Sequence, residues 1–489
     1  MPMPRPFLPP RPLLLSLFLA WPAAFPAHAL DLPDLGEISR ATLSDSQEGR
    51  IGREVMRQIR DSGDYLDDPV LLAYLDGLGD RLAEASQEPG RRFEFFAVRD
   101  PSINAFALPG GYIGVHTGLL SAVRDESELA GVLAHEIAHV TQKHIARIVD
   151  AQRSSSLTSM LALAVAILAA RSNSQVSQAA MATAQALSLQ TQLDFTRENE
   201  READRVGLQT LGAAGFAPQG MATFFERLQA QGRLYENNAP AYLRTHPLTF
   251  ERIADMQNRL AELSYRQHED SPEFRYVRAR VQAEEGSPAD AVARFEARLK
   301  TQDEGAAKAE SHYALARAAL RDNDTARARA AYAALARYDA GQALSSPLVA
   351  LLNGELLLAE KKAREAAAAT GESFKRHPGY RPLAYLHARA LLRAGRPGEA
   401  LDFLVRQQRF WAADTQFQRL AAESYQALGQ AARAHLAQAE VYVLEDRIGP
   451  AIEQLQLAQG QRGTDFYTQS IIDARLRELK ERQAGEALR

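Results

Sequence analysis

Cysteine is absent from this chain of 489 residues. Its absence excludes disulfide bonds, thiolate metal ligands and a cysteine nucleophile. Any metal site must therefore be built from histidine and carboxylate ligands, which are the other side chains that hold transition metals in proteins.

A strong charge of one sign and a long apolar run are also missing. The formal net charge is −4, and no basic stripe stands out, so nucleic acid is not an expected partner. No run reaches the ~20 apolar residues that a membrane-spanning helix needs. This disfavours a membrane-integrated protein and leaves at most peripheral membrane contact.

The N-terminal residues have the pattern of a signal peptide. Arg5 and Arg11 supply positive charge, Leu13–Ala20 form a short apolar core, and Ala27–Ala29 form a small-x-small cleavage site. The core is too short to span a bilayer, although a retained membrane anchor is the alternative. We expect residues 1–29 to be removed on export, and the lack of cysteine rules out lipid attachment by the lipoprotein route.

Residues 30–268 mix strand and helix signals. Stretches rich in β-branched and aromatic residues predict strands at Phe93–Val98, Asn104–Leu108 and Tyr112–His116. The Pro-Gly-Gly sequence between the last two predicts a tight turn, so we expect a small sheet built on a hairpin and surrounded by helices.

Leu157–Ala170 is a nearly uncharged run of fourteen residues. Its length favours a buried helix over a membrane span. A hinged lid, or a helix that touches a membrane surface, is the alternative.

Residues 269–489 are rich in alanine and have helical patterning almost throughout. Small and apolar residues recur there at a spacing of seven, five and four, with Gly or Asn in the second place. This resembles tetratricopeptide (TPR) repeats, in which small residues let paired helices pack closely and the Gly or Asn lies in the turn. A non-repeating helical bundle is the alternative, and residues 345–375 fit the spacing poorly. The complete sets are Ala279, Gly286, Ala291 and Phe295; Ala316, Asn323, Ala328 and Tyr332; and Ala388, Gly395, Ala400 and Leu404.

The sequence HEIAH at residues 135–139 carries the chemistry, and it lies inside a helix predicted to begin near Asp125. Residues four apart share one face of a helix, so His135 and His139 can reach one metal ion. Glu136 follows the first ligand and can accept a proton from a water molecule that zinc has acidified. Zinc is inferred from the ligand types, and cobalt or manganese would also bind.

A hydrolytic zinc site needs a third protein ligand, and the candidate segment is ENEREAD at residues 198–204. Glu200 and Asp204 are four apart and share a helix face, whereas Glu202 points elsewhere. One carboxylate can bind the metal while the other orients a ligand imidazole. An acidic face that is only solvated is the alternative. His144, five residues beyond the second histidine of the motif, is off the ligand face and is expected to be structural.

HEIAH followed by ENEREAD resembles the HtpX and CAAX-prenyl protease superfamily of gluzincin metallopeptidases. The resemblance implies one zinc ion per chain, held by His135, His139 and Glu200, with Glu136 as general base. It also implies that Asp204 orients a ligand from behind or donates a proton. The fold implied for the whole chain is α+β and mainly α, a gluzincin protease domain with a small sheet followed by a TPR-like α-solenoid.

Residues 104–112, NAFALPGGY, resemble the edge strand beside the active-site helix of that superfamily. By resemblance, the strand aligns an extended substrate through backbone pairing. An ordinary core strand is the alternative. The residues assigned to this role are Asn104, Ala105, Phe106, Ala107 and Leu108.

Residues 245–247, Thr-His-Pro, together with Arg252, resemble a further element of the superfamily. In the branch with this architecture the histidine lies on a loop near zinc and can take its fourth position, so His246 would restrain activity until it is displaced. Pro247 favours an extended conformation for His246, in keeping with a loop. Two alternatives stay open: His246 or Arg252 stabilises the tetrahedral oxyanion, or His246 is a solvated surface residue.

An exported protease unit followed by helical repeats resembles the periplasmic branch of this superfamily in Gram-negative bacteria. The resemblance implies a periplasmic zinc endopeptidase whose substrates are unfolded or misassembled outer-membrane proteins, and whose repeats bind the β-barrel assembly machinery. The alternative is a chaperone or adaptor that acts mainly through its repeats, with latent proteolysis. A membrane-integrated protease is disfavoured by the short apolar runs.

Overall fold

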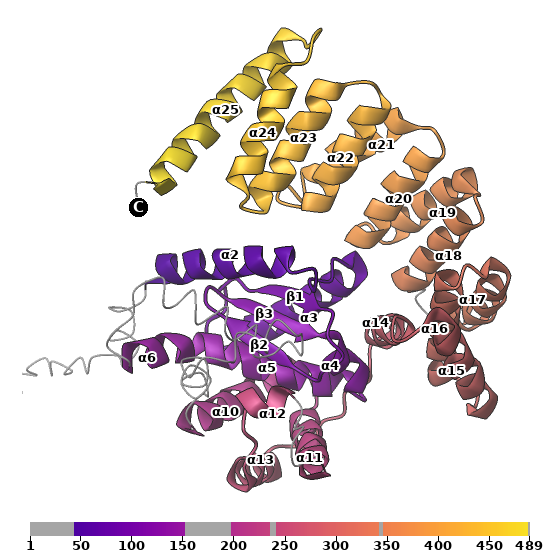
Figure 1. Cartoon of the computed structure of the whole chain (residues 1–489). Helices are drawn as coiled ribbons and strands as arrows, with labels where there is room; N and C mark the ends of the chain where they lie inside the picture. The colour runs from indigo at the N-terminus through magenta and orange to yellow at the C-terminus, as the bar shows by residue number, and fades with distance from the viewer. Residues whose placement is uncertain (1–43, 152–196, 235–240, 342–345, 488–489) are drawn as a thin grey trace, which may run out of the picture.

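The computed structural model describes residues 44–151, 197–234, 241–341 and 346–487 (Figure 1). The predicted signal peptide and the apolar run Leu157–Ala170 lie outside the described residues. Within them, no helix combines the length and the apolarity needed to cross a membrane. The fold is α+β and mainly α, as predicted.

A three-stranded sheet lies at the centre of the first part of the chain, in the order β1-β3-β2. β1 (Glu94–Val98) runs parallel to β3 (Tyr112–His116), and β2 (Ala105–Leu108) pairs with β3 as an antiparallel hairpin. The turn of the hairpin contains Gly110 and Gly111 with φ of 84° and 85°, a conformation that glycine adopts without steric cost. The predicted strands are therefore confirmed to within one residue at their ends.

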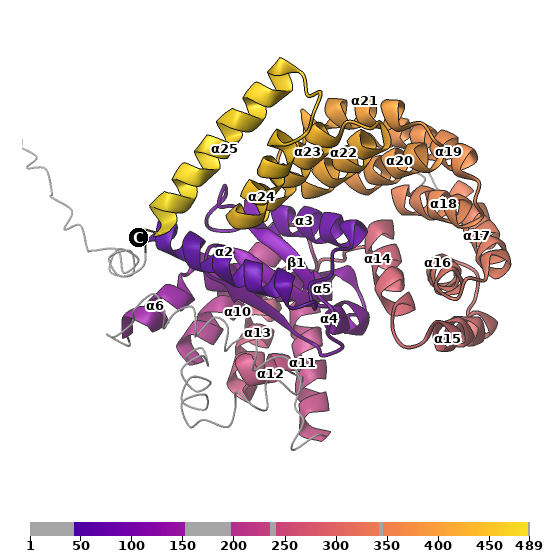
Figure 2. The ribbon, with the colours of Figure 1, turned by 45° about the horizontal axis from the view of Figure 1, so that its top comes forward.

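Helices surround this sheet on both faces (Figures 1 and 2). Alternate residues of a strand point to opposite faces, so β1 sends Phe96 and Val98 toward α2, and Phe95 and Ala97 into the main core with α3 and α5. The helices of this part are α2 (Asp45–Asp61), α3 (Pro69–Glu84), α4 (Thr117–Ala122), α5 (Glu126–Thr141), α6 (His144–Ala151), α10 (Arg197–Ala213), α11 (Gln219–Leu234), α12 (Ala241–Thr245) and α13 (Phe250–Glu262).

Helix α5 carries the HEIAH motif through the centre of the domain. Its N-cap is Asp125, whose carboxylate accepts a hydrogen bond from the backbone N–H of Glu128 at 2.9 Å, which satisfies a donor that the helix leaves unpaired. Every residue of the helix is buried. Helix α10 crosses it closely at Gly207, where a Cβ atom would lie 3.1 Å from the backbone of His135. The glycine therefore lets α10 bring its carboxylates up to the motif.

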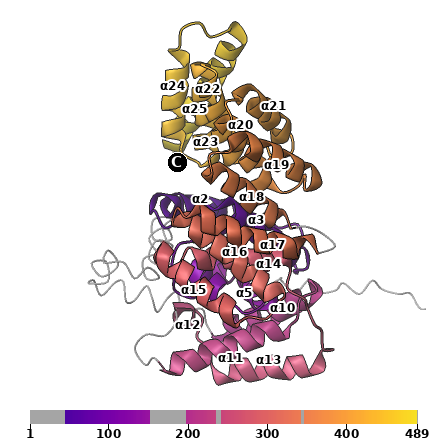
Figure 3. The ribbon, with the colours of Figure 1, turned by 90° about the vertical axis from the view of Figure 1, so that its right-hand side faces the viewer.

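The second part of the chain is a TPR-like α-solenoid of paired antiparallel helices, which curves over α2 and α3 (Figures 1, 2 and 3). The predicted small residues lie between the helices of a pair, and Ala279, Ala316 and Ala388 have no exposed surface. Its helices are α14 (Pro272–Ala283), α15 (Pro288–Thr301), α16 (Ala306–Arg321), α17 (Thr325–Ala340), α18 (Pro347–Ala359), α19 (Ala363–Arg376), α20 (Arg381–Arg393), α21 (Pro397–Gln408), α22 (Thr415–Ala427), α23 (Ala431–Leu444), α24 (Ile448–Gln459) and α25 (Phe466–Ala487).

The Gly and Asn residues that the sequence pattern predicts in the turns inside the helix pairs adopt the left-handed conformation. Gly286, Gly395 and Gly429 have φ of 71–72°, and Asn323 has φ of 59°. The stretch that fits the spacing poorly nevertheless contains, from Pro347 onward, the regular pair α18 and α19, with Lys361 in the turn at φ of 63°. The repeat is therefore irregular in sequence but not in structure. Lysine stands in its turn in place of the glycine or asparagine that takes this conformation most readily.

Ion pairs connect the solenoid to the first part of the chain beside α3. Arg280 of α14 lies 2.7 Å from Asp68, and Arg381 of α20 lies 2.8 Å from Asp76. Arg280 is nearly buried, so its pair with Asp68 is less screened by solvent than the half-exposed pair of Arg381. These contacts orient the concave side of the solenoid toward the sheet domain.

Candidate metal centre

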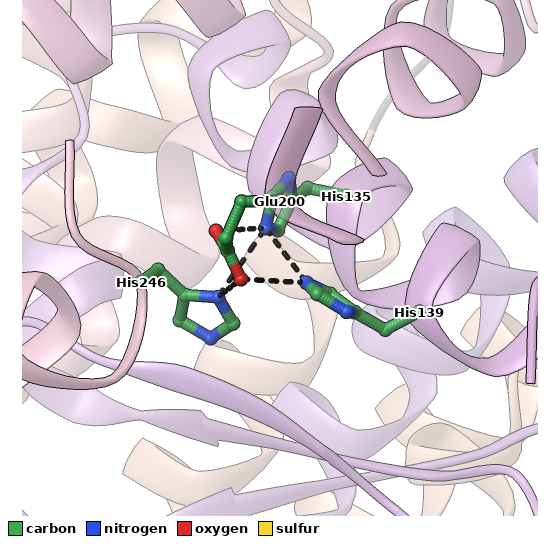
Figure 4. A group of neighbouring side chains, drawn as sticks. All are labelled: His135, His139, Glu200 and His246. Atoms are coloured by element: carbon green, nitrogen blue, oxygen red, sulfur yellow. Dashed lines mark hydrogen bonds and ion pairs between the residues drawn. The ribbon is translucent and has the colours of Figure 1, made fainter. Parts of the chain in front are cut away.

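Helix α5 places the two histidines of the motif on one face, one turn apart (Figure 4). The Nε2 atoms of His135 and His139 lie 3.0 Å from each other. Helix α10 brings Glu200 against both, with carboxylate-to-Nε2 distances of 3.6 Å to His135 and 3.4 Å to His139. All three side chains are buried. The structure thus joins residues that are separated by more than sixty positions in the sequence.

His246 belongs to the same cluster. It follows directly on the short helix α12, and its Nδ1 lies 3.0 Å from Glu200 Oε1 and 3.4 Å from His135 Nε2. The Tyr242 ring stacks on the His246 imidazole with centroids 4.7 Å apart. One ligand atom from each of His135, His139, Glu200 and His246 lies within 4.8 Å of the others. His246 is completely buried, so it is not a solvated surface residue.

Two observations indicate that the cluster fits a zinc ion: the types of its donor atoms, and a buried Glu136 carboxylate that has no hydrogen-bond partner in the part of the chain that the structure describes. Three imidazoles and one carboxylate form a nitrogen and oxygen set of the kind that binds zinc with four ligands. Glu136 has no exposed surface, and neither of its carboxylate oxygens has a hydrogen-bond partner among the described residues. A buried carboxylate without partners is costly in a purely protein environment, but it is expected where a cation and a polarised water complete the site.

Asp204 and Arg252 support the cluster from behind. Asp204 Oδ1 lies 3.0 Å from His135 Nδ1, which is the ring nitrogen that does not face the other ligands. Arg252 donates to both oxygens of Asp204, at 2.6 and 2.7 Å, and its Nη1 lies 2.7 Å from Glu200 Oε2. The contact between Asp204 and His135 is a close electrostatic one without hydrogen-bond geometry, and such outer contacts help to orient a ligand imidazole.

The buried charges compensate one another. Burial raises the pKa of Asp204, but the Arg252 guanidinium and the His135 imidazole outweigh it and hold that pKa below its usual value. Burial raises the pKa of Glu200 too, and His246 and Arg252 bring it well below its usual value. Burial lowers the pKa of His135, but Asp204 and Glu200 raise it to about 9. Both acidic residues are therefore ionised near neutral pH, which is the state a carboxylate ligand such as Glu200 requires, whereas metal binding would displace the proton from His135.

Arg252 also fixes the segment that carries His246. Its Nη1 donates to the carbonyl oxygen of Pro247 at 2.8 Å, so one guanidinium links Asp204, Glu200 and the residue after His246. These contacts direct the guanidinium toward the carboxylates, which favours an orienting role for Arg252 over contact with a substrate.

His144 contacts the site, although the sequence did not assign it there. Its Nδ1 lies 2.8 Å from the Nδ1 of His139. His144 is five residues after His139 and would be off the ligand face if the helix continued. However, α5 ends at Thr141, and Lys143 has φ of 54°. The chain turns there and α6 begins at His144, which directs that imidazole back at His139. No glycine or proline marks this break, so the ordinary sequence signal for it is missing.

Comparisons with known proteins agree with this geometry. The model of peptidase family M48 matches residues 71–260, a range that includes every residue of the cluster. The β-barrel assembly-enhancing protease of Escherichia coli (strain K12) is 34% identical over 467 residues, which are 94% of this chain and 93% of the relative. A putative β-barrel assembly-enhancing protease of Vibrio cholerae is 40% identical over 58% of this chain and 60% of the relative. The mitochondrial metalloendopeptidase OMA1 of Schizosaccharomyces pombe is 33% identical over 39% of this chain and 53% of the relative.

The family model covers the HEIAH helix, and the similarity to the Escherichia coli protein covers 94% of this chain and so extends into the repeats. The clustered ligands and the buried carboxylate beside them are the structural features of a metal-dependent peptidase. The chain therefore belongs to peptidase family M48 and is a metalloprotease similar to the β-barrel assembly-enhancing proteases.

Proposed function

We propose that the chain is a zinc endopeptidase of the periplasm that cleaves unfolded or misassembled outer-membrane proteins and is restrained by His246. The observation that carries the proposal is the buried cluster of His135, His139 and Glu200 with Glu136 beside it. In this proposal residues 1–29 are the signal peptide, residues 30–268 form the protease unit, and residues 269–489 form the repeats that bind partners.

The roles of the protein groups follow from their positions. When bound, zinc polarises the scissile carbonyl and makes a water molecule acidic enough to be deprotonated near neutral pH. Glu136 lies beside the cluster, with Oε1 3.5 Å from His246 Nε2, so it can accept that proton and pass it to the leaving amine. Asp204 holds His135 with Nε2 toward the cluster, and Arg252 holds Asp204.

β2 is the proposed substrate strand. The N–H of His116 donates to the carbonyl oxygen of Asn104 at 3.0 Å, and hydrogen-bonding residues alternate along an antiparallel pair. Ala105 and Ala107 therefore direct their backbone N–H and C=O groups away from β3, where an extended substrate can pair with them. The amide side chain of Asn104 is also buried without a hydrogen-bond partner among the described residues, and it lies where that pairing would begin.

The His246 segment is attached to the same strand. The N–H of Tyr242, in the first turn of α12, donates to the carbonyl oxygen of Ile103 at 3.1 Å. By the same alternation, Ile103 faces away from β3 and precedes the proposed pairing groups. Helix α12 thus occupies the start of the strand while His246 fills the fourth position of the cluster. A substrate that pairs with β2 and extends back to Ile103 would compete with α12 for the Ile103 carbonyl oxygen, which supports His246 as a restraint.

Cleavage of an unfolded outer-membrane β-barrel protein by the purified chain tests the proposal, with an unfolded helical protein as the comparison substrate. We expect slow cleavage of the β-barrel protein, little cleavage of the helical one, and loss of all cleavage when a chelator removes the metal. Equal cleavage of both would contradict recognition by strand pairing. Binding of the β-barrel assembly machinery without any cleavage, even after His246 is replaced, would favour an adaptor.

Replacement of His246 by Ala is expected to increase cleavage. If the open site is about a tenth of the population, removal of the competing imidazole raises the apparent rate on the order of tenfold. Initial rates are measured by appearance of new N-termini, with the metal content of each protein determined in parallel.

The matched control for that variant is His435→Ala, which removes a histidine in the solenoid that contacts Gln454. It is expected to cleave at the parent rate. A slower His246→Ala protein with its metal retained would instead assign His246 to stabilisation of the oxyanion.

A further inference from the structure

We propose that His144 and Glu202 form a hydrogen-bonded relay that positions His139, and so sets how tightly the site holds its metal. The inference rests on the zinc site of the proposed function, because it concerns the outer contacts of one ligand of that site. It adds two positioning residues that are not among the proposed ligands: His144, beyond the HEIAH motif, and Glu202, which lies in ENEREAD two residues after Glu200.

The relay is continuous in the structure. His139 Nδ1 and His144 Nδ1 are 2.8 Å apart, and His144 Nε2 lies 3.2 Å from Glu202 Oε2. Arg147 donates to Glu202 Oε2 at 2.9 Å and also to the side-chain oxygen of Asn199. The two imidazoles have no exposed surface, whereas the side chain of Glu202 is 36% exposed. The relay therefore runs from the buried ligand to a carboxylate at the surface.

The positions of the ring nitrogens determine the direction of the hydrogen bonds. His139 Nε2 faces His135 and Glu200, so metal binding through that atom requires the proton of His139 to be on Nδ1. His144 Nδ1 must then accept this proton's hydrogen bond, and His144 Nε2 carries the proton that is donated to Glu202.

The two histidine ligands thus receive different outer partners. His135 has a buried carboxylate directly on its Nδ1, that of Asp204. His139 has a neutral imidazole in the corresponding place, with the carboxylate one step further out. A carboxylate in direct contact increases the basicity of a ligand imidazole more than a neutral acceptor does, so the relay mainly fixes the orientation of the His139 ring.

The relay also joins the elements that make the site. His144 is the first residue of α6, and Glu202 lies on α10, two residues beyond Glu200. The break at Lys143 lets α6 turn toward α10. A shift of α6 would therefore move the outer contact of His139 without touching the ligands themselves.

Zinc affinity of the purified, refilled protein tests the inference, measured by competition with a chelating dye. Loss of an outer partner lowers metal affinity about 10–100-fold, and we expect a loss in that range for His144→Ala. His144→Asn places an amide oxygen where Nδ1 stood and should keep affinity close to that of the parent. The thermal stability of each metal-free protein is measured in parallel with its zinc affinity. If His144 served only the fold, His144→Ala would lower thermal stability, and His144→Asn would not restore zinc affinity.

Glu202→Ala provides the second test in case His144→Ala does not fold, and Glu198→Ala is its control, since Glu198 is exposed on the same helix. We expect weaker zinc binding for Glu202→Ala only. Equal affinities for the Glu202 variant and its control, or equal losses for His144→Ala and His144→Asn, would overturn the relay. If the parent itself binds no zinc, the proposed function fails, which is a different outcome from unchanged affinity in the variants.

Discussion

Replacement of Glu136 by Gln is expected to lower the kcat for peptide cleavage by about 10²–10⁴-fold while the protein keeps its fold and its metal. The amide has nearly the shape of the carboxylate but cannot accept a proton from the attacking water. Glu136 makes no hydrogen bond to the described residues, and its one ion-pair contact, with His246 at 3.5 Å, is already absent in the His246→Ala background used below. The rate is measured on an unfolded β-barrel protein in the His246→Ala background, where the parent rate is highest.

The control for this experiment is Glu198→Gln, a change of the same chemistry at an exposed position of α10. It is expected to leave the rate unchanged. Metal content and thermal unfolding are compared among the three proteins, because loss of the metal would also abolish cleavage. A Glu136→Gln protein that retains more than about a tenth of the parent kcat would exclude Glu136 as the general base, since the effect would fall below the range for such a group.

Replacement of Arg252 by Met is expected to destabilise the packing of α10 against α5 by about 3–5 kcal/mol, the cost of leaving a buried charge without its partner. Arg252 is nearly buried and compensates Asp204 and Glu200 together. Methionine fills much of the same volume but removes the guanidinium that both carboxylates share, leaving them only their imidazole neighbours. Hydrogen exchange of α10 amides in the metal-free protein measures the effect, because it reports local opening in a chain with several folding units.

Arg259→Met on the same helix provides the comparison. Arg259 forms a partly exposed pair with Asp255 one turn away, and such pairs contribute about 0–1 kcal/mol. Addition of Asp204→Asn to Arg252→Met should recover part of the lost stability, because it neutralises one of the two carboxylates that lose the guanidinium. Equal protection of α10 in the Arg252 and Arg259 variants would show that the buried charges are compensated by other means.

Local spacing predicted much of the fold. The hairpin strands, the start of α5 at Asp125 and the placement of Gly286 and Gly395 in turns all follow from patterns within about ten residues. Such features depend on side-chain alternation, capping and backbone preference, all of which are determined by residues close together in the sequence. The pair α18 and α19 was less evident because its turn uses lysine, and packing overrides the weaker local preference.

The sequence could predict only those parts of the site in which two residues lie on the same helix, because a helix sets which residues share a face. His135 and His139 are four residues apart on α5, and Glu200 and Asp204 are four apart on α10, so each pair was expected to share a face. The sequence contains no direct information on how the two helices meet. Their contact depends on Gly207, which permits the close crossing at His135.

The sequence by itself determined which types of side chain could form the site. Because the chain has no cysteine, candidate metal ligands had to be histidines and carboxylates, and the HEIAH spacing predicted two of them and a candidate general base on one helix. Tertiary structure alone decided which distant groups complete the site. His246 reaches the ligands from α12, Arg252 links two buried carboxylates, and His144 turns back to His139 because the helix breaks at Lys143. These contacts depend on the packing of elements far apart in the chain, where burial makes each charge require a partner.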